Sequence, residues 1–246
     1  DGVTATTAAP PVDALELFHP LVRQWFTERV GTPTDVQTAA WPRIAGGDNV
    51  LVTAPTGSGK TLTAFLWALD RLVCGDWPEN STSVLYVSPL KALNNDIRRN
   101  LLTPLEELRG IFEQAGAPFP NIRALTRSGD TPQEDRRRML RQPPEILITT
   151  PESLNLLVSS QGGRGLLSGL QTVILDEIHA VVGSKRGVHL ITAVDRLVRL
   201  SGEFQRIALS ATVRPLDRVA EFVGGYQLVE GSAGAAEYVP RPVEIL

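Results

Sequence analysis

The chain has 246 residues, of which 42% are apolar and 21% are charged, and its formal net charge at pH 7 is −3. This composition is typical of a soluble globular protein, and the length allows one large domain or two small ones. The single cysteine, Cys74, excludes an internal disulfide and a cysteine-rich zinc site, and the lack of an apolar run of about 18 residues argues against a membrane-spanning helix.

The N-terminal segment divides into a lead and a helix. Residues 1–13 are small, polar and rich in proline, so we expect a disordered lead. This lead lacks the basic and apolar parts of a secretion signal, and we therefore predict a cytoplasmic protein that makes no membrane contact. Apolar residues at helical spacing over residues 15–30 predict a helix that ends at Gly31.

A glutamine, Gln37, lies in the first turn of the next predicted helix, which Thr34 or Asp35 can cap. Its carboxamide has both a donor and an acceptor, so it could bind the amino group and a ring nitrogen of adenine. Taken alone, Gln37 could equally be a surface residue. The phosphate-binding sequence that follows favours the adenine-binding role.

The stretch Ala54-Pro-Thr-Gly-Ser-Gly-Lys-Thr61 predicts a phosphate-binding loop. It stands between a strand pattern at 50–53 and a helical pattern at 62–72, which is the context such a loop needs. Its glycines let the backbone approach a phosphate, and the N–H groups of the loop and the helix point at the anion. Lys60 is expected to reach the β- and γ-phosphates, and Thr61 to bind Mg²⁺. The predicted nucleotide-binding residues of the loop are Thr56, Gly57, Ser58, Gly59, Lys60 and Thr61.

Short apolar runs alternate with amphipathic helical patterns along the rest of the chain. Such alternation is typical of a parallel sheet with helices on both faces. We therefore predict a three-layer α/β domain with roughly seven mostly parallel strands over residues 14–230. Residues 231–246 are rich in Gly, Ala and Pro and predict a linker. Strands are predicted at 50–53, 84–88, 122–126, 145–149, 172–175, 206–209 and 226–229, helices at 89–109, 133–141, 151–158, 188–200 and 216–223, and a glycine-rich loop at 162–169.

Polar residues follow two of the apolar strands, where the loops of a parallel sheet carry function. Asp176 comes directly after one strand, and its carboxylate is expected to bind Mg²⁺ near Thr61. Glu177 could orient the attacking water or accept its proton, with a solvated surface pair as the alternative. His179 is either a structural residue or a contact of the Ser210–Thr212 loop that senses the γ-phosphate. The hydroxyls of that loop could relay between the site and a groove, or cap a helix.

A second group of loops suits a different ligand. Their cationic, hydroxyl and helix N-terminal donors fit a row of backbone phosphates on one nucleic-acid strand. The basic runs Arg136–Arg138 and Lys185–Arg186, with Arg141, add positive charge, although a charged helix is usually a solvated face. The predicted nucleic-acid contacts are Pro89, Lys91, Thr126, Arg127, Gly129, Thr150, Pro151 and Ser153.

Together these motifs resemble the first RecA-like domain of a superfamily 2 helicase, a phosphate-loop NTPase fold. The resemblance covers residues 18 to about 230 and rests on Gln37, the phosphate loop, Ser88–Leu93, Thr150–Leu154, Asp176–His179 and Ser210–Thr212. Finer features are similar to the large helicase-related (Lhr) proteins, namely Phe18–Pro20, Trp25-Phe26, Arg127–Pro132, Ile148–Ser153 and Gly183–Gly187. The sequence Asp-Glu-Ile-His differs from that of the DEAD-box RNA helicases, whose fourth residue is Asp.

The resemblance implies ATP-driven 3′-to-5′ movement on single-stranded DNA, unwinding of DNA or RNA–DNA duplexes, and a role in DNA repair. By position, Lys60, Asp176 and Glu177 would be catalytic, with ATP and Mg²⁺ as cofactors and Thr61 and Asp176 as the metal ligands. His179 and the loop of Ser210, Ala211 and Thr212 would couple hydrolysis to movement.

The family motor also contains a second RecA-like domain, which contributes arginines to the transition state. An arginine finger supplies about 10³–10⁵ in rate in phosphate-loop enzymes. This chain carries one set of motifs, and residues 231–246 would lead towards the second domain. We therefore expect the chain alone to bind nucleotide, to hydrolyse it poorly and to unwind nothing.

Two other functions stay open from the residues alone. The first is an RNA-dependent ATPase on the same fold, which stimulation by poly-U rather than poly-dT would distinguish. The second is a non-catalytic nucleotide-binding module, which would have no need of Glu177.

Overall fold

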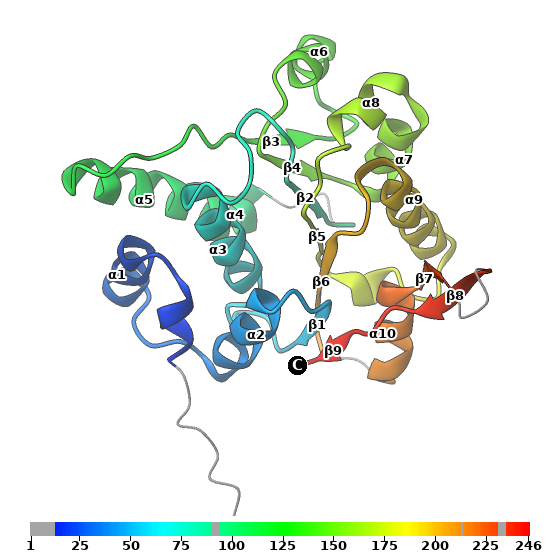
Figure 1. Cartoon of the computed structure of the whole chain (residues 1–246), viewed down its shortest axis with the longest axis horizontal. Coiled ribbons are helices and arrows are strands. Elements are labelled where there is room, and N and C mark those ends of the chain that lie inside the picture. Colours follow the sequence, from blue (N-terminus) through cyan, green and yellow to red (C-terminus); the bar gives the residue numbers. More distant parts are fainter. Residues whose placement is uncertain (1–12, 90–93, 213, 231–234) are drawn as a thin grey trace, which may run out of the picture.

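The computed structural model describes residues 13–89, 94–212, 214–230 and 235–246. The predicted disordered lead, apart from Asp13, and the predicted contact Lys91 lie outside these ranges. The described residues form a seven-stranded sheet between two layers of helices, together with a separate two-stranded ribbon (Figure 1). The predicted three-layer α/β fold is thus confirmed.

The main sheet has the strand order β3-β4-β2-β5-β6-β1-β9, and all of its pairings are parallel. Its central strands are buried along their whole length, as their apolar sequences require. Because the strands are parallel, the loops that follow them meet at one edge of the sheet. The strands of this sheet are β1 Val50–Thr53, β2 Val84–Val87, β3 Ala124–Arg127, β4 Ile146–Thr149, β5 Thr172–Leu175, β6 Gln205–Ser210 and β9 Glu244–Ile245.

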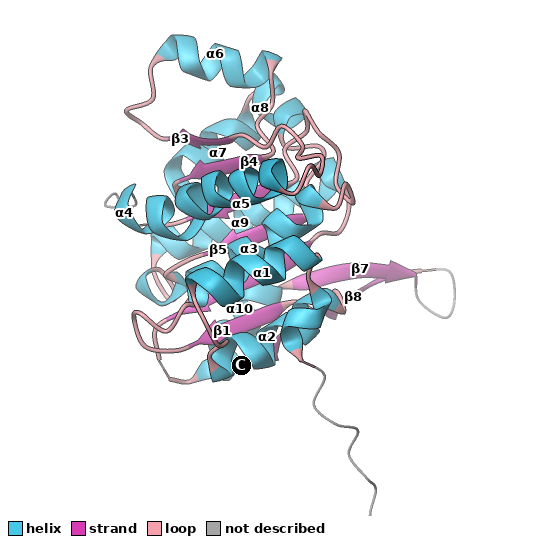
Figure 2. Cartoon of the chain, turned by 90° about the vertical axis from the view of Figure 1, so that its left-hand side faces the viewer, coloured by secondary structure: helices cyan, strands magenta, loops and turns pink. Residues whose placement is uncertain are grey.

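Helices cover both faces of the sheet (Figures 1 and 2). One face carries α1 Pro20–Arg29, α2 Asp35–Ala45, α3 Lys60–Val73, α4 Asn94–Ile97 and α5 Thr103–Gln114, with a π-helical turn at Arg98–Leu102. The other carries α6 Gln133–Arg141, α7 Pro151–Ser159, α8 Gln161–Leu166, α9 Lys185–Ser201 and α10 Leu216–Gly224. Among the described helices, none combines the length and the apolar character that crossing a membrane requires.

Each face of the sheet has its own hydrophobic core. Successive side chains of a strand point to opposite faces. In β2, for example, Val84 and Tyr86 belong to the core under α3, whereas Leu85 and Val87 belong to the core under α9. The central strands are apolar at most positions because both faces of the sheet are covered, which explains why they read as nearly continuous apolar runs.

The N-terminal region contains two helical pieces where the sequence predicts one helix over residues 15–30. A 3₁₀-helix spans Ala14–Leu17, and α1 begins at Pro20. Between them, His19 has an extended backbone, and its Nδ1 accepts the N–H of Leu21 at 3.2 Å. Its own N–H donates to the buried carboxylate of Asp70 on α3 at 2.7 Å. This bond ties the N-terminal helices to the helix that follows the phosphate loop.

The C-terminal residues differ from the predicted linker. The strand predicted at 226–229 is β7 (Tyr226–Glu230), but it pairs antiparallel with β8 (Ala236–Pro240) in a ribbon that projects from the body (Figure 2). The seventh place in the main sheet belongs instead to β9, which pairs with β1. The two strands inside the predicted linker, β8 and β9, are defined by main-chain hydrogen bonds to a neighbouring strand. A composition rich in Gly and Pro therefore does not predict them.

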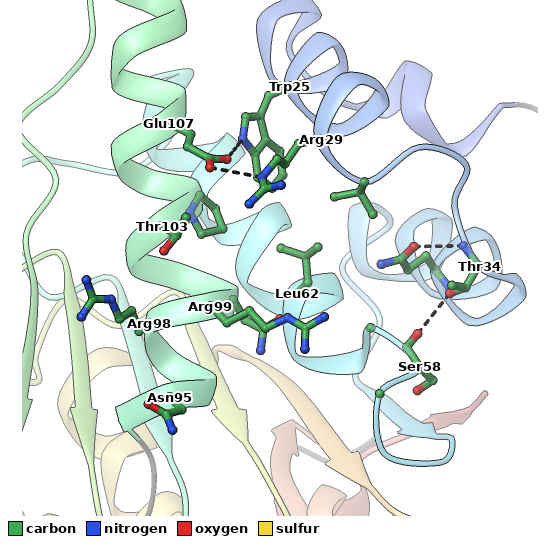
Figure 3. Close-up of a pocket in the computed structure, with 16 residues that line it drawn as sticks. Trp25, Arg29, Thr34, Ser58, Leu62, Asn95, Arg98, Arg99, Thr103 and Glu107 are labelled. Carbon is green, nitrogen blue, oxygen red and sulfur yellow. Dashed lines mark hydrogen bonds and ion pairs between the residues drawn. The ribbon is translucent and has the colours of Figure 1, made fainter.

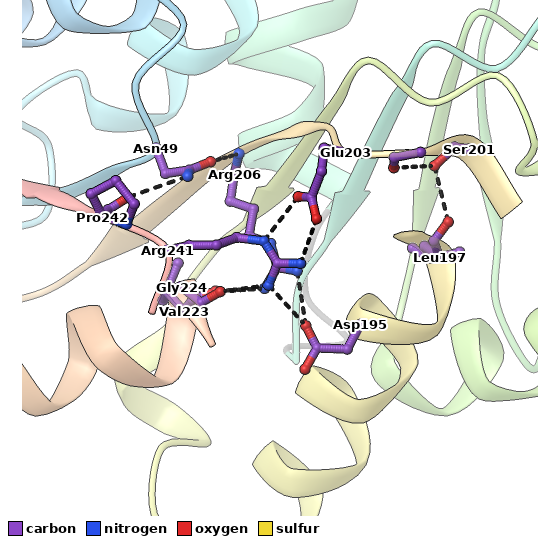
Figure 4. A network of polar contacts seen from close by, with 11 residues as sticks. Asn49, Asp195, Leu197, Ser201, Glu203, Arg206, Val223, Gly224, Arg241 and Pro242 are labelled. Atoms are coloured by element: carbon purple, nitrogen blue, oxygen red, sulfur yellow. Dashed lines mark hydrogen bonds and ion pairs between the residues drawn. The ribbon is translucent and has the colours of Figure 1, made fainter. Parts of the chain in front are cut away.

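Arg241 holds this C-terminal segment against the rest of the domain (Figure 4). Its guanidinium donates to both carboxylate oxygens of Glu203, at 2.8 and 2.9 Å, and to the carbonyl of Gly224 at 3.0 Å. Such two-pronged pairs are geometrically specific. These polar contacts therefore hold the residue Arg241, shortly before β9, against the end of α10 and against Glu203.

Arg206 on β6 is fully buried beside Arg241, and it should be the more important of the two for stability. It donates to the carbonyls of Val223 and Gly224 at 2.8 and 3.1 Å, and to Asp195 at 2.8 Å. We expect Arg206→Met to lower the free energy of unfolding by about 1–3 kcal/mol, because the buried carbonyl of Val223 loses its donor whereas that of Gly224 keeps Arg241. Urea titrations measure this change. The exposed Arg199→Met on α9 is the control, and equal stabilities of the two variants would contradict the prediction.

Candidate active site

The phosphate loop joins β1 to α3, as predicted. Gly57 and Gly59 both have a φ of +85°, which residues other than glycine adopt rarely. A Cβ atom at Gly59 would also lie 2.8 Å from the side-chain nitrogen of Gln37. Lys60 and Thr61 are the first two residues of α3, so the helix N-terminus faces the loop. The structure thus brings the loop and the predicted adenine-binding glutamine side by side.

The ammonium group of Lys60 is buried inside this loop. It donates to the carbonyls of Ala54 and Pro55 at 2.5 and 3.0 Å. Burial lowers the pKa of Lys60, and the nearby carboxylates of Glu177 and Asp176 act in the opposite direction. An ammonium has three N–H donors, so one donor stays available for a phosphate oxygen.

Gln37 is buried and takes part in the cap of α2. Its side-chain oxygen accepts the N–H of Thr34 at 3.0 Å, and the Thr34 hydroxyl accepts the N–H of Gln37 at 3.3 Å. This reciprocal pair is a capping box, which confirms Thr34 as the cap. Because the cap engages the oxygen, the amide nitrogen beside Gly59 is the group that Gln37 presents to the pocket.

A pocket of about 590 Å³ opens beside the phosphate loop (Figure 3). Gln37 and the loop residues 57–59 line one side, and Arg98 and Arg99 line another. The two arginines lie on the π-helical turn before α5, and such turns are frequent at functional sites. The volume falls within the range of small-molecule sites. The cationic wall suits an anionic ligand the size of a nucleotide.

Asp176 follows β5 and is almost completely buried. Its Oδ1 accepts the N–H of Glu177 at 2.8 Å, and its Oδ2 accepts the hydroxyl of Tyr86. Burial raises the pKa of Asp176, and these two hydrogen bonds oppose that effect. Burial and the neighbouring carboxylate also raise the pKa of Tyr86, so its hydroxyl stays a donor.

Glu177 has a left-handed backbone conformation, with φ 52° and ψ 36°. Such conformations are uncommon outside glycine and cluster at functional sites. Its Oε2 lies 3.2 Å from Nε2 of His179, and Nδ1 of the same ring accepts the N–H of Ala211 at 3.1 Å. Since Nδ1 is an acceptor, Nε2 carries the hydrogen and points it at Glu177. The predicted contact between His179 and the loop after β6 is therefore present, through the backbone of Ala211.

The residues at this edge fit a Mg–nucleotide complex. Magnesium is usually held by one or two protein oxygens together with phosphate oxygens and water, and Thr61 and Asp176 offer a hydroxyl and a carboxylate. The hydroxyl of Ser58 in the loop is buried without a hydrogen-bond partner among the described residues. A buried hydroxyl without a partner is expected to bind a polar ligand.

The strand order separates the two predicted sets of ligand contacts. The nucleotide set follows β1, β5 and β6, whereas the nucleic-acid set follows β2, β3 and β4, so each occupies one half of the sheet edge. In the second half, Thr126 and Gly129 are exposed, and Arg127 and Thr150 are half-buried. The side chains of Pro89, Pro151 and Ser153 are buried. The N–H of Ser153 donates to the hydroxyl of Thr150, which caps α7.

The basic runs have more specific partners than their composition suggests. Arg136 turns back onto the loop after β3 and donates to the carbonyls of Thr131, Gly129 and Ser128 at 2.7, 2.6 and 3.3 Å. It therefore shapes the loop that contains Arg127. Burial and the charge of Arg136 both lower the pKa of Arg127.

Arg186 is also paired with another side chain. It donates to both carboxylate oxygens of Glu152 on α7, at 2.5 and 3.1 Å. Arg137, Arg138 and Arg141 are exposed, as on a solvated helix face. The basic runs thus contain both structural contacts and free surface charge.

Sequence reasoning missed several residues of this site. Tyr86 lies within an apolar strand, and its only signal was a hydroxyl in an otherwise apolar run. Arg98 and Arg99 carried no signal, because a helical pattern does not reveal which face borders a pocket.

Comparisons with known proteins agree with this arrangement. Residues 34–219 match the DEAD/DEAH box helicase family. The chain is 52% identical over 215 residues to the "Lhr helicase/probable uracil glycosylase" of Mycolicibacterium smegmatis, covering 87% of this chain and 14% of the relative. It is 49% identical over 213 residues to the ATP-dependent helicase Lhr-Core of Methanothermobacter thermautotrophicus, covering 85% of this chain and 25% of the relative.

A solved structure is similar as well. It is the Mycobacterium smegmatis helicase Lhr bound to ssDNA and AMP-PNP, with a TM-score of 0.83 and 48% identity, covering 96% of this chain and 28% of that chain. This chain therefore spans only a part, between 14% and 25%, of the two curated relatives. The sequence match and the shared RecA-like fold agree that the chain belongs to the DEAD/DEAH box helicase family and groups with the Lhr helicases.

Proposed function

We propose that this chain is the ATP-binding motor domain of an ATP-dependent DNA helicase that acts in the cytoplasm. ATP hydrolysis would drive movement on single-stranded DNA and the unwinding of DNA or RNA–DNA duplexes. The observation that carries the proposal is the phosphate loop between β1 and α3, in which the ammonium of Lys60 is buried against the carbonyls of Ala54 and Pro55. The role in DNA repair and the 3′-to-5′ direction stay predictions from the resemblance.

Each group at the nucleotide half has a distinct part in the proposed reaction. The third N–H of Lys60 would bind a phosphate oxygen, with the loop N–H groups neutralising the rest of the charge. Thr61 and Asp176 would hold Mg²⁺, which supplies electrostatic stabilisation of the developing phosphate charge. Glu177 would orient the attacking water and accept its proton.

The contact between His179 and Ala211 offers a route from hydrolysis to movement. The imidazole links the catalytic carboxylate of Glu177 to the loop after β6 through its two ring nitrogens. A change in the position of Glu177 would move the imidazole and, through it, this loop. We propose that this link, with Ser210 and Thr212, transmits the state of the nucleotide to the nucleic-acid half of the edge.

The nucleic-acid partner is proposed to be a single DNA strand. The similar Lhr structure contains ssDNA and AMP-PNP together, which supports the binding of both kinds of ligand by one protein. A second RecA-like domain of the full-length protein would complete the nucleotide site, and the much greater length of the relatives supports its presence. If poly-U stimulated turnover more than poly-dT, an RNA-dependent ATPase would be the better assignment.

The direct test is a titration of the chain with a fluorescent ATP analogue, with and without Mg²⁺. We expect saturable binding that Mg²⁺ strengthens and that unlabelled ATP displaces. The chain alone should hydrolyse ATP poorly, because the second domain would supply the arginines of the transition state. Absence of saturable binding would overturn the assignment, and fast DNA-stimulated turnover by this chain alone would overturn the need for a second domain.

Arg127 is the residue that tests the nucleic-acid half. We expect Arg127→Gln to weaken binding of oligo-dT and to make the slope of log K against log salt less negative by about 0.7, the value for one lost phosphate contact on a single strand. Fluorescence anisotropy at several salt concentrations measures both quantities. Arg137→Gln on the exposed face of α6 is the matched control, and identical slopes for the two variants would argue against a phosphate contact at Arg127.

A further inference from the structure

Among the described residues, Tyr86 is the one whose side chain donates a hydrogen bond to Asp176. Both oxygens of the carboxylate are engaged, since Oδ1 accepts the N–H of Glu177 and Oδ2 accepts the Tyr86 hydroxyl. A carboxylate oxygen has two acceptor positions, so each oxygen keeps one position for another ligand. Rotation of the carboxylate would break both bonds, and its orientation is therefore defined.

The strand register explains why these two side chains meet. Tyr86 on β2 pairs with Ile174 on β5. Asp176 comes two residues after Ile174, and residues two apart in a strand point to the same face. The carboxylate therefore leaves the end of β5 on the face that Tyr86 occupies. The meeting depends on parallel pairing between two strands whose residues are 90 positions apart in the chain.

The ring of Tyr86 is itself held in place. It is fully buried, and it stacks on Phe65 with ring centroids 4.9 Å apart and an interplanar angle of 28°. Phe65 belongs to α3, the helix that begins with Lys60 and Thr61. The hydroxyl of Tyr86 therefore sits in a fixed position relative to both the phosphate loop helix and the end of β5.

We infer that Tyr86 is a positioning residue, whose hydroxyl orients the Asp176 carboxylate for Mg²⁺ bound with the nucleotide. The inference rests on the proposed function. Residues that orient a metal ligand typically affect metal affinity by about 10–100-fold when they are lost. Tyr86 makes no contact with the ion or the nucleotide in this scheme. Its loss should therefore weaken the binding of Mg²⁺ but not the binding of the nucleotide without Mg²⁺.

The test compares Tyr86→Phe with the wild-type chain in two titrations. A fluorescent ADP analogue is bound first in a buffer freed of divalent cations on a chelating resin, and Mg²⁺ is then titrated into the complex. We expect the affinity for the analogue without Mg²⁺ to be unchanged, which also shows that the variant is folded. We expect the affinity of the complex for Mg²⁺ to fall by about tenfold. Tyr238→Phe, an exposed tyrosine on β8, is the matched control and should behave as the wild type.

A second variant separates the hydroxyl from the packing of the ring. Phe65→Leu removes the stacking partner but leaves the Tyr86 hydroxyl in the protein, so its loss of Mg²⁺ affinity should be clearly smaller. An equal loss in Phe65→Leu and Tyr86→Phe, or an unchanged Mg²⁺ affinity in Tyr86→Phe, would overturn the role of the hydroxyl. If the wild-type chain itself showed no Mg²⁺-dependent binding, the proposed function would fail, and the inference with it.

Discussion

Replacing Lys60 with alanine is expected to remove most nucleotide binding while leaving the fold intact. Truncating one partner of a buried, hydrogen-bonded charge pair costs about 2–5 kcal/mol of binding, which corresponds to roughly 30- to 5,000-fold in affinity. The fold should survive, because the hydrogen bonds that Lys60 makes to carbonyls stay within its own loop. Burial also disfavours the charged ammonium, so its removal relieves part of that cost. A titration with a fluorescent ATP analogue in the presence of Mg²⁺ measures the loss.

The control for this experiment is Lys185→Ala, which removes an exposed lysine at the start of α9. It should bind the analogue as the wild type does. Thermal unfolding of Lys60→Ala should resemble that of the wild type. Binding that persists in Lys60→Ala at wild-type affinity would mean that the phosphates do not occupy the loop, and the proposed nucleotide site would be wrong.

Replacing Glu177 with glutamine is expected to abolish turnover while nucleotide binding is retained. General acid–base groups contribute about 10²–10⁴ in rate, and glutamine has the same shape without the proton-accepting carboxylate. Its side-chain oxygen can still accept the hydrogen that His179 presents from Nε2. The contact from His179 to Ala211 should therefore survive, so the loss should be confined to the chemical step.

This prediction is best measured in a longer protein, in which the same chain is followed by a second RecA-like domain. Steady-state ATP hydrolysis with saturating oligo-dT gives the rate, and a filter-binding assay shows whether unhydrolysed ATP stays bound. Glu152→Gln on α7 is a matched control, since Glu152 is an exposed acid paired with Arg186 at the other half of the edge. Undiminished turnover in Glu177→Gln would remove Glu177 from the catalytic role.

Features that depend on neighbours in sequence were predicted with few errors. The phosphate loop, the cap of α2 by Thr34 and the strand–helix alternation all follow from spacing over a few residues. The gathering of polar loops at one edge also followed, because parallel strands place their carboxyl ends together. The separation into two halves did not follow, since the strand order is a property of the folded sheet.

The errors arise where distant segments meet. The glycine-rich stretch 162–169 was predicted as a loop, yet most of it forms α8. A Cβ atom at Gly163 would lie 2.2 Å from the carbonyl oxygen of Leu157, so a glycine is needed there for close packing against the end of α7 rather than for a turn. In the same way, β9 exists because β1 offers it main-chain partners.

The sequence by itself determined the chemistry of this protein, because a phosphate loop and an Asp-Glu pair after a strand are made from residues adjacent in the chain. Tertiary structure decided how those groups are oriented. The hydrogen bond from Tyr86 to Asp176, the link of His179 to Ala211 and the turning of Arg136 onto its loop each join groups on separate elements. Such contacts depend on strand order, register and packing, which no local pattern of residues encodes.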